Sequence, residues 1–478
     1  YNHWVTAGFF GRLNYNYKEK YLLEVNGRYD GTSRFMKDQR WNFFPSFSLG
    51  WNVARENFWK PLESVVNQFK LRGSWGELGN QNTSNLYPFY EILPVKSNSG
   101  NWLVNGGKTN TADIPSLVST LLTWERVRSF NVGFDFGAFS NRLTGSFDYF
   151  VRKTVDMVGP APQLPLVLGI APAIVNNADM KSYGFEIELS WRDRIGEVDY
   201  GVKFNLADAQ QKVVKYPNTT NAFNDWYAGK MSGEIWGYTS LGIAKTDEEM
   251  KEHLASLPNG GQNQLGNKWG AGDIMYADIN GDGKVDGGKG TLADPGDQRI
   301  IGNSTPRYNF GLVLDASYKG FDVSIFFQGV GKRDYAPIVG TNGAVFWGAV
   351  NNIWQSMAME EHFDYFRPEG HPMGANLNGY YPRPDFTSNK NHQVQTRYLQ
   401  DASYIRLKNL QIGYTLPKQW INKLHINRCR VYVSGDNLWT GTSLASMFDP
   451  ETLAAGDWGS GKTYPLSKVI SFGLNVNF

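Results

Sequence analysis

The chain has 478 residues, of which 15% are aromatic and only 19% are charged, and its formal net charge is +2. This near balance gives no electrostatic basis for nucleic-acid binding, and the single cysteine, Cys429, excludes an intrachain disulfide framework and a cysteine-based zinc site. No run of the sequence approaches the ~20 apolar residues that a transmembrane helix requires.

Apolar and polar side chains alternate along much of the chain, and this alternation predicts about 13 strands. The predicted strands span residues 5–17, 21–30, 42–54, 67–78, 122–137, 142–151, 184–191, 198–206, 308–318, 321–328, 402–416, 427–437 and 467–478. In the last strand Ile470, Phe472 and Leu474 share one parity, whereas Ser471 and Asn475 share the other. Because successive side chains of a strand point to opposite faces, each strand has an apolar and a polar face.

One predicted strand changes parity along its length. Ile405 and Leu407 occupy odd positions, whereas Leu410 and Ile412 occupy even ones. One extra residue on this strand would restore the register with its neighbours, so we predict a β-bulge near residues 408–409.

Short and long connections alternate between the predicted strands. Short or moderate connections lie at residues 18–20, 55–66, 138–141, 192–197, 319–320 and 417–426, and long ones at roughly 78–121, 155–180, 212–304, 332–401 and 438–466. In an up-and-down meander alternate connections lie at the same end, which is the arrangement of outer-membrane barrels with short periplasmic turns and long extracellular loops. We therefore predict an all-β fold, a transmembrane antiparallel up-and-down β-barrel. Soluble β-sandwiches would explain the alternation but not the regular order of the connections.

One long loop contains a sequence similar to an EF-hand-type calcium loop, in which oxygen ligands alternate and a glycine permits a sharp turn. The candidate ligands in loop 278–297 are Asp278, Asn280, Asp282, Lys284 through its carbonyl, Asp286 through a water, and Asp297. Position 12 is Lys289 rather than a bidentate glutamate. The alternative is an Asx-rich loop held by side-chain-to-backbone bonds. A bound Ca²⁺ would stiffen this loop rather than perform chemistry, and no cofactor is otherwise expected.

The long loops also carry aromatic residues that could bind a substrate or a partner, because aromatic faces stack on sugar rings and pack against proteins. The candidate binding residues are Trp102, Trp226, Tyr227, Trp236, Trp347, Trp354, Tyr380, Tyr381 and Trp458. For any single residue, the alternative is that the loops fold on one another and use it in a small core.

Enzyme chemistry has little support in the sequence, and we expect a protein that is not an enzyme. The six histidines are scattered, and Glu360-Glu361-His362 lacks the second histidine of a metalloprotease helix. Neither a Gly-x-Ser-x-Gly elbow nor a phosphate loop occurs. Charges of the polar parity, such as Glu24, Asp148 and Glu186, could guide a polar substrate. We favour the alternative that they bond to neighbouring strands or to a domain that fills the barrel.

Short motifs follow one another in a fixed order along the whole chain. They include Asp30-Gly-Thr-Ser-Arg-Phe35, Leu71-Arg-Gly-Ser-Trp-Gly76, Tyr183-Gly-Phe-Glu-Ile-Glu188, Asp278-Ile-Asn-Gly-Asp-Gly283, Tyr404-Ile-Arg-Leu-Lys-Asn409 and Asp449-Pro-Glu451. Each motif alone is weak, but in this order they resemble the SusC/RagA-type TonB-dependent outer-membrane transporters of Bacteroidetes.

The resemblance implies a plugged 22-stranded barrel, of which residues 1–478 are the carboxy-terminal portion. The plug and the TonB-interacting segment are expected to lie outside this chain, which we interpret as a processed product or a fragment. The resemblance also implies import of a large polar nutrient, an oligosaccharide or alternatively a peptide, across the outer membrane of a Gram-negative bacterium. The implied partners are a SusD-like surface lipoprotein, the TonB complex and outer-membrane lipid, and a dimer of transporter–lipoprotein pairs is compatible with it.

A second hypothesis comes from another class of protein. A secreted or surface-attached all-β carbohydrate-binding protein or enzyme would share the alternating strands and the aromatic loops. Partition into detergent with the outer membrane, and a gel mobility that changes on heating, would distinguish a barrel from such a protein.

Overall fold

The computed structural model describes the chain except residues 1–2, 84, 161–164, 166, 168, 171, 338–343, 349–358, 386–388, 422–424 and 454–462. The described chain divides into two compact units. Unit 1 comprises Tyr1–Ile187, Ala209–Thr220 and Asp225–Met231, and unit 2 comprises Glu188–Asp208, Asn221–Asn224 and Ser232–Phe478.

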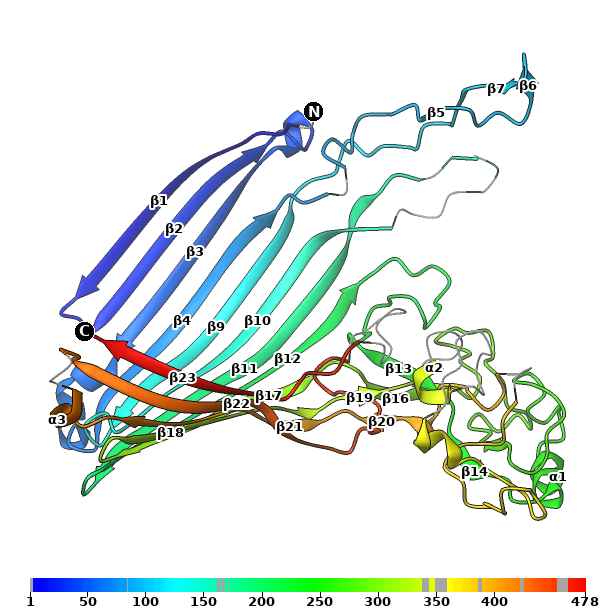
Figure 1. Ribbon diagram of the computed structural model, residues 1–478. Helices are drawn as coiled ribbons and strands as arrows, with labels where there is room; N and C mark the ends of the chain where they lie inside the picture. The colour runs from blue at the N-terminus through cyan, green and yellow to red at the C-terminus, as the bar shows by residue number, and fades with distance from the viewer. Residues whose placement is uncertain are drawn as a thin grey trace. The chain divides into compact units, whose positions relative to one another are not determined.

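Thirteen strands form one sheet in which the neighbours follow one another along the chain (Figure 1). They are β1 (Thr6–Tyr17), β2 (Tyr21–Thr32), β3 (Trp41–Asn52), β4 (Val66–Asn80), β9 (Glu125–Ala138), β10 (Leu143–Gly159), β11 (Val175–Ile195), β12 (Val198–Lys215), β17 (Arg307–Tyr318), β18 (Phe321–Lys332), β21 (Tyr404–Thr415), β22 (Arg428–Thr442) and β23 (Val469–Asn477). Each of these strands coincides with a predicted one. The predicted antiparallel, up-and-down, all-β fold is therefore confirmed.

Several strands extend further toward the long loops than the alternation predicts, and β10, β11 and β12 do so most. β10 continues to Gly159, β11 begins at Val175 and β12 ends at Lys215. Arg152 and Lys153 interrupt the alternation in β10, but this strand still pairs with β9 as far as residue 155. Backbone hydrogen bonds form the ladder whatever the side chains are. The strands can therefore continue beyond the point where the alternation of apolar and polar residues ends.

The predicted β-bulge is present in β21. Its register against β18 and against β22 shifts between Leu407 and Asn409, and Lys408 has no partner in either ladder. Because of the extra residue, the odd-numbered apolar side chains before the bulge and the even-numbered ones after it lie on the same face. This explains the change of parity in the sequence.

In unit 1, the apolar face of the first three strands carries two rows of stacked aromatic rings. Trp41 stacks on Phe9 and Tyr29 near one end of the strands, with ring centroids 6.2 and 5.1 Å apart. Tyr21 stacks on Tyr17 and Trp51 near the other end, at 6.5 Å in both cases. Along β1, Phe9 and Tyr17 are about 26 Å apart at the usual rise per residue. This separation suits an apolar band of about 25 Å between two aromatic girdles.

Apolar side chains that a soluble protein would bury remain uncovered in both units. Phe472 and Leu474 of β23 are 83% and 65% exposed. Phe185 of β11 and Leu312 of β17 are half-buried, and neither belongs to a buried core. One face of these strands therefore has the polarity of a surface that contacts lipid.

None of the helices in the described ranges is long and apolar enough to cross a membrane.

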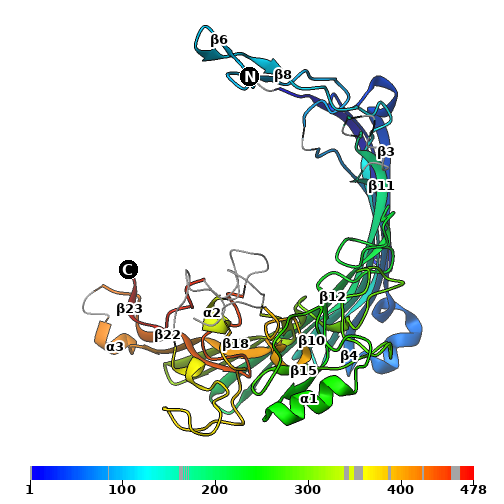
Figure 2. The ribbon, with the colours of Figure 1, turned by 90° about the vertical axis from the view of Figure 1, so that its right-hand side faces the viewer.

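The long connection after β4 in unit 1 forms a two-stranded arm. It pairs β5 (Val95–Lys96) with β8 (Thr111–Ala112), and β6 (Leu103–Val104) with β7 (Gly107–Lys108). Figures 1 and 2 show the arm extending away from the ends of β3 and β4. Near the base of this connection, Phe35, Phe44, Leu122 and Trp124 form a small buried core.

The long loops of unit 2 contain short sheets and helices. Their strands are β13 (Glu234–Gly237) with β16 (Arg299–Asn303), β14 (Ser240–Ile243) with β15 (Ile274–Tyr276), and β19 (Asp334–Tyr335) with β20 (Gln400–Asp401). The described helices of the whole chain are α1 (Asp247–Ala255), α2 (Ala344–Trp347), α3 (Lys418–Ile421), and the 3-10 helices η1 (Lys37–Gln39), η2 (Val53–Arg55), η3 (Asn57–Leu62), η7 (Glu360–Phe363) and η8 (Thr396–Tyr398).

These unit 2 loops share a hydrophobic cluster, which we call the loop core. Its buried members are Tyr238, Leu257, Ile274, Tyr276, Val285, Val345, Phe346, Trp347, Tyr381, Tyr398, Ala402, Leu444, Phe448 and Leu453. The cluster draws on segments more than 200 positions apart in the chain, so the loops fold together rather than separately.

Candidate functional site

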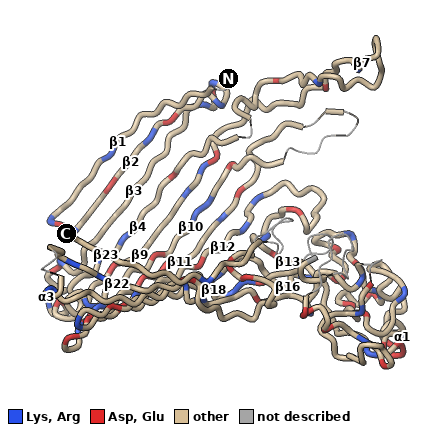
Figure 3. Tube along the Cα trace, in the orientation of Figure 1, with Lys and Arg blue, Asp and Glu red and all other residues tan. Residues whose placement is uncertain are grey.

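Charged side chains recur along the strands of the sheet (Figure 3). In unit 1, Arg72 of β4 bridges two further strands on the polar face. Its Nη2 lies 2.8 Å from Oδ1 of Asp135 in β9 and 2.8 Å from Oδ2 of Asp148 in β10, and its Nη1 donates to Oδ1 of Asp148 at 3.0 Å. One cation thus ties three neighbouring strands together.

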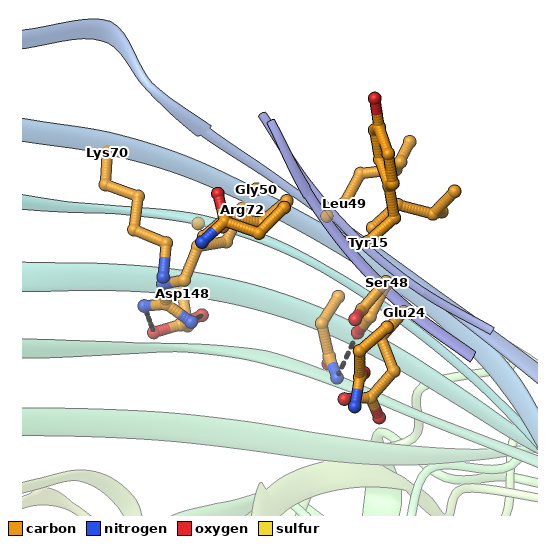
Figure 4. A pocket seen from close by; sticks show the side chains of 16 residues that line it. Tyr15, Glu24, Ser48, Leu49, Gly50, Lys70, Arg72 and Asp148 are labelled. Carbon is orange, nitrogen blue, oxygen red and sulfur yellow. Dashed lines mark hydrogen bonds and ion pairs between the residues drawn. The ribbon is translucent and has the colours of Figure 1, made fainter. Parts of the chain in front are cut away.

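A cavity of about 490 Å³ lies against this network (Figure 4). Lys70, Arg72 and Asp148 stand on one side of the strands in the figure, whereas Tyr15 and Leu49 stand on the other. Lys70 forms no ion pair with any described residue. The cavity therefore presents hydrogen-bonding groups, on the polar face, to whatever fills the space beside it.

Some other charges of the polar parity bond within the sheet, either along one strand or between strands. Glu24 accepts a bond from Asn26 at 2.8 Å, and Arg28 donates two bonds to Asp30. In unit 2, Arg430 of β22 pairs with Asp322 of β18. The pairs made by Arg72 and Arg430 agree with the alternative we favoured, in which such charges bond to neighbouring strands. The hydrogen bonds of Glu24 and Arg28 stay within β2, and Glu186 is exposed.

Two motifs that the sequence analysis quoted separately bind each other in unit 2. Arg406 of β21 is buried, and its guanidinium lies 2.8 Å from Oδ1 of Asp449 and 2.7 Å from Oε2 of Glu451. Lys408 adds a third bridge, 2.7 Å from Oε1 of Glu451. Burial alone would raise the pKa of Asp449, but the bonds from Arg406 and from the backbone amides of Glu451 and Leu466 outweigh it and lower that pKa. We call these four charged residues the loop clamp, because they fasten the last long loop to β21.

A second buried network joins two of the long loops of unit 2. Asp273 is fully buried and accepts bonds from Lys390 at 2.9 Å, from Asn391 at 2.9 Å and from both Nε and Nη2 of Arg383 at 2.7 and 2.6 Å. Lys390 is also buried and lies over the ring of Trp269 at 5.0 Å. Because every group of this buried network is hydrogen-bonded, the network specifies that these two loops pack against each other.

The carboxylates of loop 278–297 accept bonds from backbone amides. Asp278 accepts from Gly281 and Gly283, and Asp297, fully buried, accepts from Ile279, Asn280 and Asp286. Of the other candidate ligands, Asn280, Asp282 and Asp286 accept from the amides of residues 282, 284 and 288, and the ammonium of Lys284 bonds to Asp286.

This arrangement has the bonding of an Asx-rich loop, the alternative to a calcium site. Among the residues that the structure describes, no three His, Cys, Asp or Glu side chains are placed to hold a metal ion. Burial nevertheless raises the pKa of Asp297 despite the three bonds that it accepts. Calcium in this loop stays a prediction.

The predicted aromatic residues fall into three groups. Trp102 is 60% exposed on the arm of unit 1, and Trp226 is exposed beside Lys230, whose ammonium lies 5.7 Å from the ring. Those that are buried or packed against other aromatic rings are Trp347 and Tyr381 in the loop core, Tyr380 against it, Tyr227, and Trp236 stacked on Phe223. Trp354 and Trp458 lie outside the described residues. Among the candidate aromatic residues that the structure describes, Trp102 and Trp226 are the ones that a ligand or partner can reach.

Sequence reasoning missed the roles of Asp273 and Lys390, because single polar residues inside a long loop carry no periodic signal. The loop clamp did leave a signal. One motif contains two cations, Arg406 and Lys408, and a later motif contains two anions, Asp449 and Glu451. Pairing these opposite charges would have placed the last loop against β21 before the structure was known.

Comparison with known proteins identifies the family to which this architecture corresponds. Residues 4–438 match the family described as TonB dependent receptor-like, beta-barrel. TonB-dependent receptor P3 of Formosa agariphila is 30% identical over 98% of this chain and 45% of its own length. TonB-dependent receptor SusC of Bacteroides thetaiotaomicron is 24% identical over 99% of this chain and 44% of its own length. The chain thus spans about half the length of these relatives.

A solved structure, that of the RagAB peptide transporter, superposes with a TM-score of 0.74 at 22% identity, over 99% of this chain and 48% of the other. At this identity the likeness shows the fold. Together with the relatives above, it confirms the resemblance to SusC/RagA-type proteins on which the expectations of import and partners depend.

Proposed function

Because the chain belongs to the TonB-dependent receptor-like β-barrel family, whose members are transporters rather than enzymes, we propose that it is part of an outer-membrane importer for a large polar nutrient. The protein to which it belongs would sit in the outer membrane of a Gram-negative bacterium of the Bacteroidetes type. Import would involve binding at the extracellular mouth and energy from TonB, without covalent chemistry on the nutrient.

The observation that carries this proposal is the two-faced sheet. Exposed apolar side chains and aromatic rows occupy one face, and bonded charges such as Arg72 and Asp148 occupy the other. A soluble sandwich would bury the apolar face against a second sheet, but Phe472 and Leu474 are largely exposed. In a membrane barrel, the apolar face would contact lipid, and the polar face would contact the filled interior of the barrel.

The substrate and the partners belong to the same proposal. An oligosaccharide fits the exposed rings of Trp102 and Trp226, whereas a peptide is the cargo named for the structurally similar RagAB transporter. The SusC relative supports a SusD-like surface lipoprotein as the partner at the mouth. A dimer of transporter–lipoprotein pairs remains compatible with this assembly.

Two substitutions test whether exposed rings bind the nutrient. Trp102→Ala removes an exposed ring and is expected to weaken nutrient binding at least several-fold without changing the thermal unfolding of the protein. Trp347→Ala is the control, because truncating a buried aromatic costs about 3–5 kcal/mol of stability. Binding is measured by titrating oligosaccharides and peptides into the protein in detergent. Unchanged binding in the Trp102 variant would refute a role for the arm.

Membrane location has a separate test. The protein should fractionate with the outer membrane, resist extraction by salt, and change its gel mobility on heating. Recovery in a soluble fraction, with mobility independent of heating, would refute the transporter proposal and favour the secreted all-β alternative.

A further inference from the structure

One buried histidine in the loop core is unusual because nothing satisfies its ring. His392 is 1% exposed, and among the residues that the structure describes neither its Nδ1 nor its Nε2 has a hydrogen-bond partner. Most buried polar side chains in folded proteins are paired, so an orphaned imidazole at this depth requires an explanation.

His392 lies against helix α2. Its ring centroid is 4.5 Å from that of Trp347, which is also 1% exposed and whose Nε1 has no partner either. Trp347 in turn packs edge-on against Tyr398 at 4.8 Å and Tyr381 at 6.2 Å. A neutral imidazole can occupy such a site as an aromatic ring, but an imidazolium would be a buried charge among apolar rings.

A second histidine contacts the same helix. Nε2 of His362 lies 3.0 Å from the carbonyl of Val345 and 3.1 Å from that of Phe346, and its Nδ1 accepts a bond from the amide of Met359 at 3.0 Å. These contacts require the tautomer with its proton on Nε2. Helix α2 therefore contacts two imidazoles, one through its backbone carbonyls and one through the ring of Trp347.

The charged groups around His392 offer its proton no acceptor. Lys390, Asp273 and Arg383 are bonded to one another, as described above. The charge of Asp385 raises the pKa of His392, against the larger effect of burial, and Asp385 lies 3.7 Å from the ammonium of Lys390. Tyr381 and Tyr398, which pack on Trp347, have phenol pKa values raised chiefly by burial, so both rings are uncharged. Burial lowers the pKa of His392 to about 4.

We propose that His392 and α2 form an acid-sensitive latch, which keeps the loop core closed at neutral pH and releases Trp347 when His392 takes up a proton. The open state exposes His392 to water, where its charge is solvated. Acid would thereby loosen the contact between the two long loops of unit 2 that Asp273 and Lys390 join.

The sign and size of the effect follow from linkage. The pKa of His392 is lower in the closed state than in an open one, so closure is fully favoured above the ordinary pKa of 6.5 and weakens as pH falls toward about 4. Between pH 6.5 and pH 4, the opening equilibrium is expected to rise on the order of 80-fold.

Hydrogen exchange of the amides of residues 345–348, corrected for intrinsic rates, measures this opening in the protein in detergent. His392→Phe keeps an aromatic ring but cannot take up a proton, and it is expected to change less than about two-fold over the same pH range. His371→Phe, which replaces a histidine outside the loop core, is the matched control and should behave as the wild type.

Two outcomes would overturn the latch. One is a wild-type protein without acid-dependent opening at α2, and the other is an opening that persists in the His392→Phe variant. If that variant does not fold, the titration of His392 in the wild type, followed by NMR of its Cε1–H, decides the matter. A titration near pH 6.5 would refute the proposal, and one near pH 4 that coincides with opening would support it.

Discussion

The loop clamp allows a quantitative prediction about one buried arginine. Arg406→Met keeps the apolar stem but removes the charge that faces Asp449 and Glu451. Breaking a buried ion pair by removing one partner costs roughly 3–5 kcal/mol. Here Glu451 keeps Lys408 as a partner, and Asp449 keeps the backbone amides of Glu451 and Leu466. We therefore expect the substitution to lower the stability of this loop by about 2–3 kcal/mol, because both carboxylates keep some of their hydrogen-bond partners.

The loss should be local to the last long loop and to β21. Hydrogen exchange of the amides of Glu451 and Leu466, both donors to Asp449, reports it directly. A loss of 2–3 kcal/mol corresponds to exchange faster by about 30- to 150-fold. In the wild type, the lowered pKa of Asp449 means that its contribution is present above the unfolded pKa and is lost as pH falls through the folded one. Acid should therefore loosen the wild-type loop and have less effect on the variant.

The matched control is an exposed ion pair. Arg55 pairs with Glu19, and both side chains are more than half exposed, so Arg55→Met should cost less than about 1 kcal/mol. Equal effects of the two substitutions would show that burial does not strengthen the clamp. An Arg406→Met variant whose Glu451 and Leu466 amides exchange at the wild-type rate would refute the reasoning altogether.

Three further predictions test other parts of the structure. Val132→Arg places a charge on the apolar face of β9 and should destabilise the protein by about 2–4 kcal/mol in denaturant unfolding from lipid vesicles, whereas the adjacent Asn131→Arg on the polar face should cost under about 1 kcal/mol; equal costs would refute the assignment of faces. The bond from Lys20 lowers the pKa of Glu56 to about 2, so exchange protection of connection 53–65 should be constant above pH 4.5 and fall toward pH 2, a decline that Glu56→Gln should abolish. Asp297→Ala should lower the stability of the protein by about 2–3 kcal/mol because three backbone donors lose their acceptor. Separately, if loop 278–297 binds calcium, a chelator should lower the unfolding temperature in calorimetry; an unchanged unfolding temperature would show that hydrogen bonds alone hold the loop.

The strands could be predicted from the sequence because each carries its own signal. Alternation along β23 depends only on which of the two faces of the sheet each side chain occupies, and every strand repeats that requirement locally. The bulge at Lys408 was predictable for the same reason, since a change of parity within β21 has no other simple repair. The ends of β10, β11 and β12 were not predictable, because backbone pairing continued where the alternation stopped.

By itself, the sequence determined the fold class, the strands, the order of short and long connections and the family resemblance. Only the tertiary structure decided which loop aromatics are buried, as Trp347 and Tyr381 are, and which remain exposed, as Trp102 does. It alone brought Asp273 to Lys390 and Arg406 to Asp449 across 117 and 43 positions of the chain. The physical reason is that a strand's pattern is set by the face it presents, whereas a loop contact depends on which distant segments meet, and no local period records that.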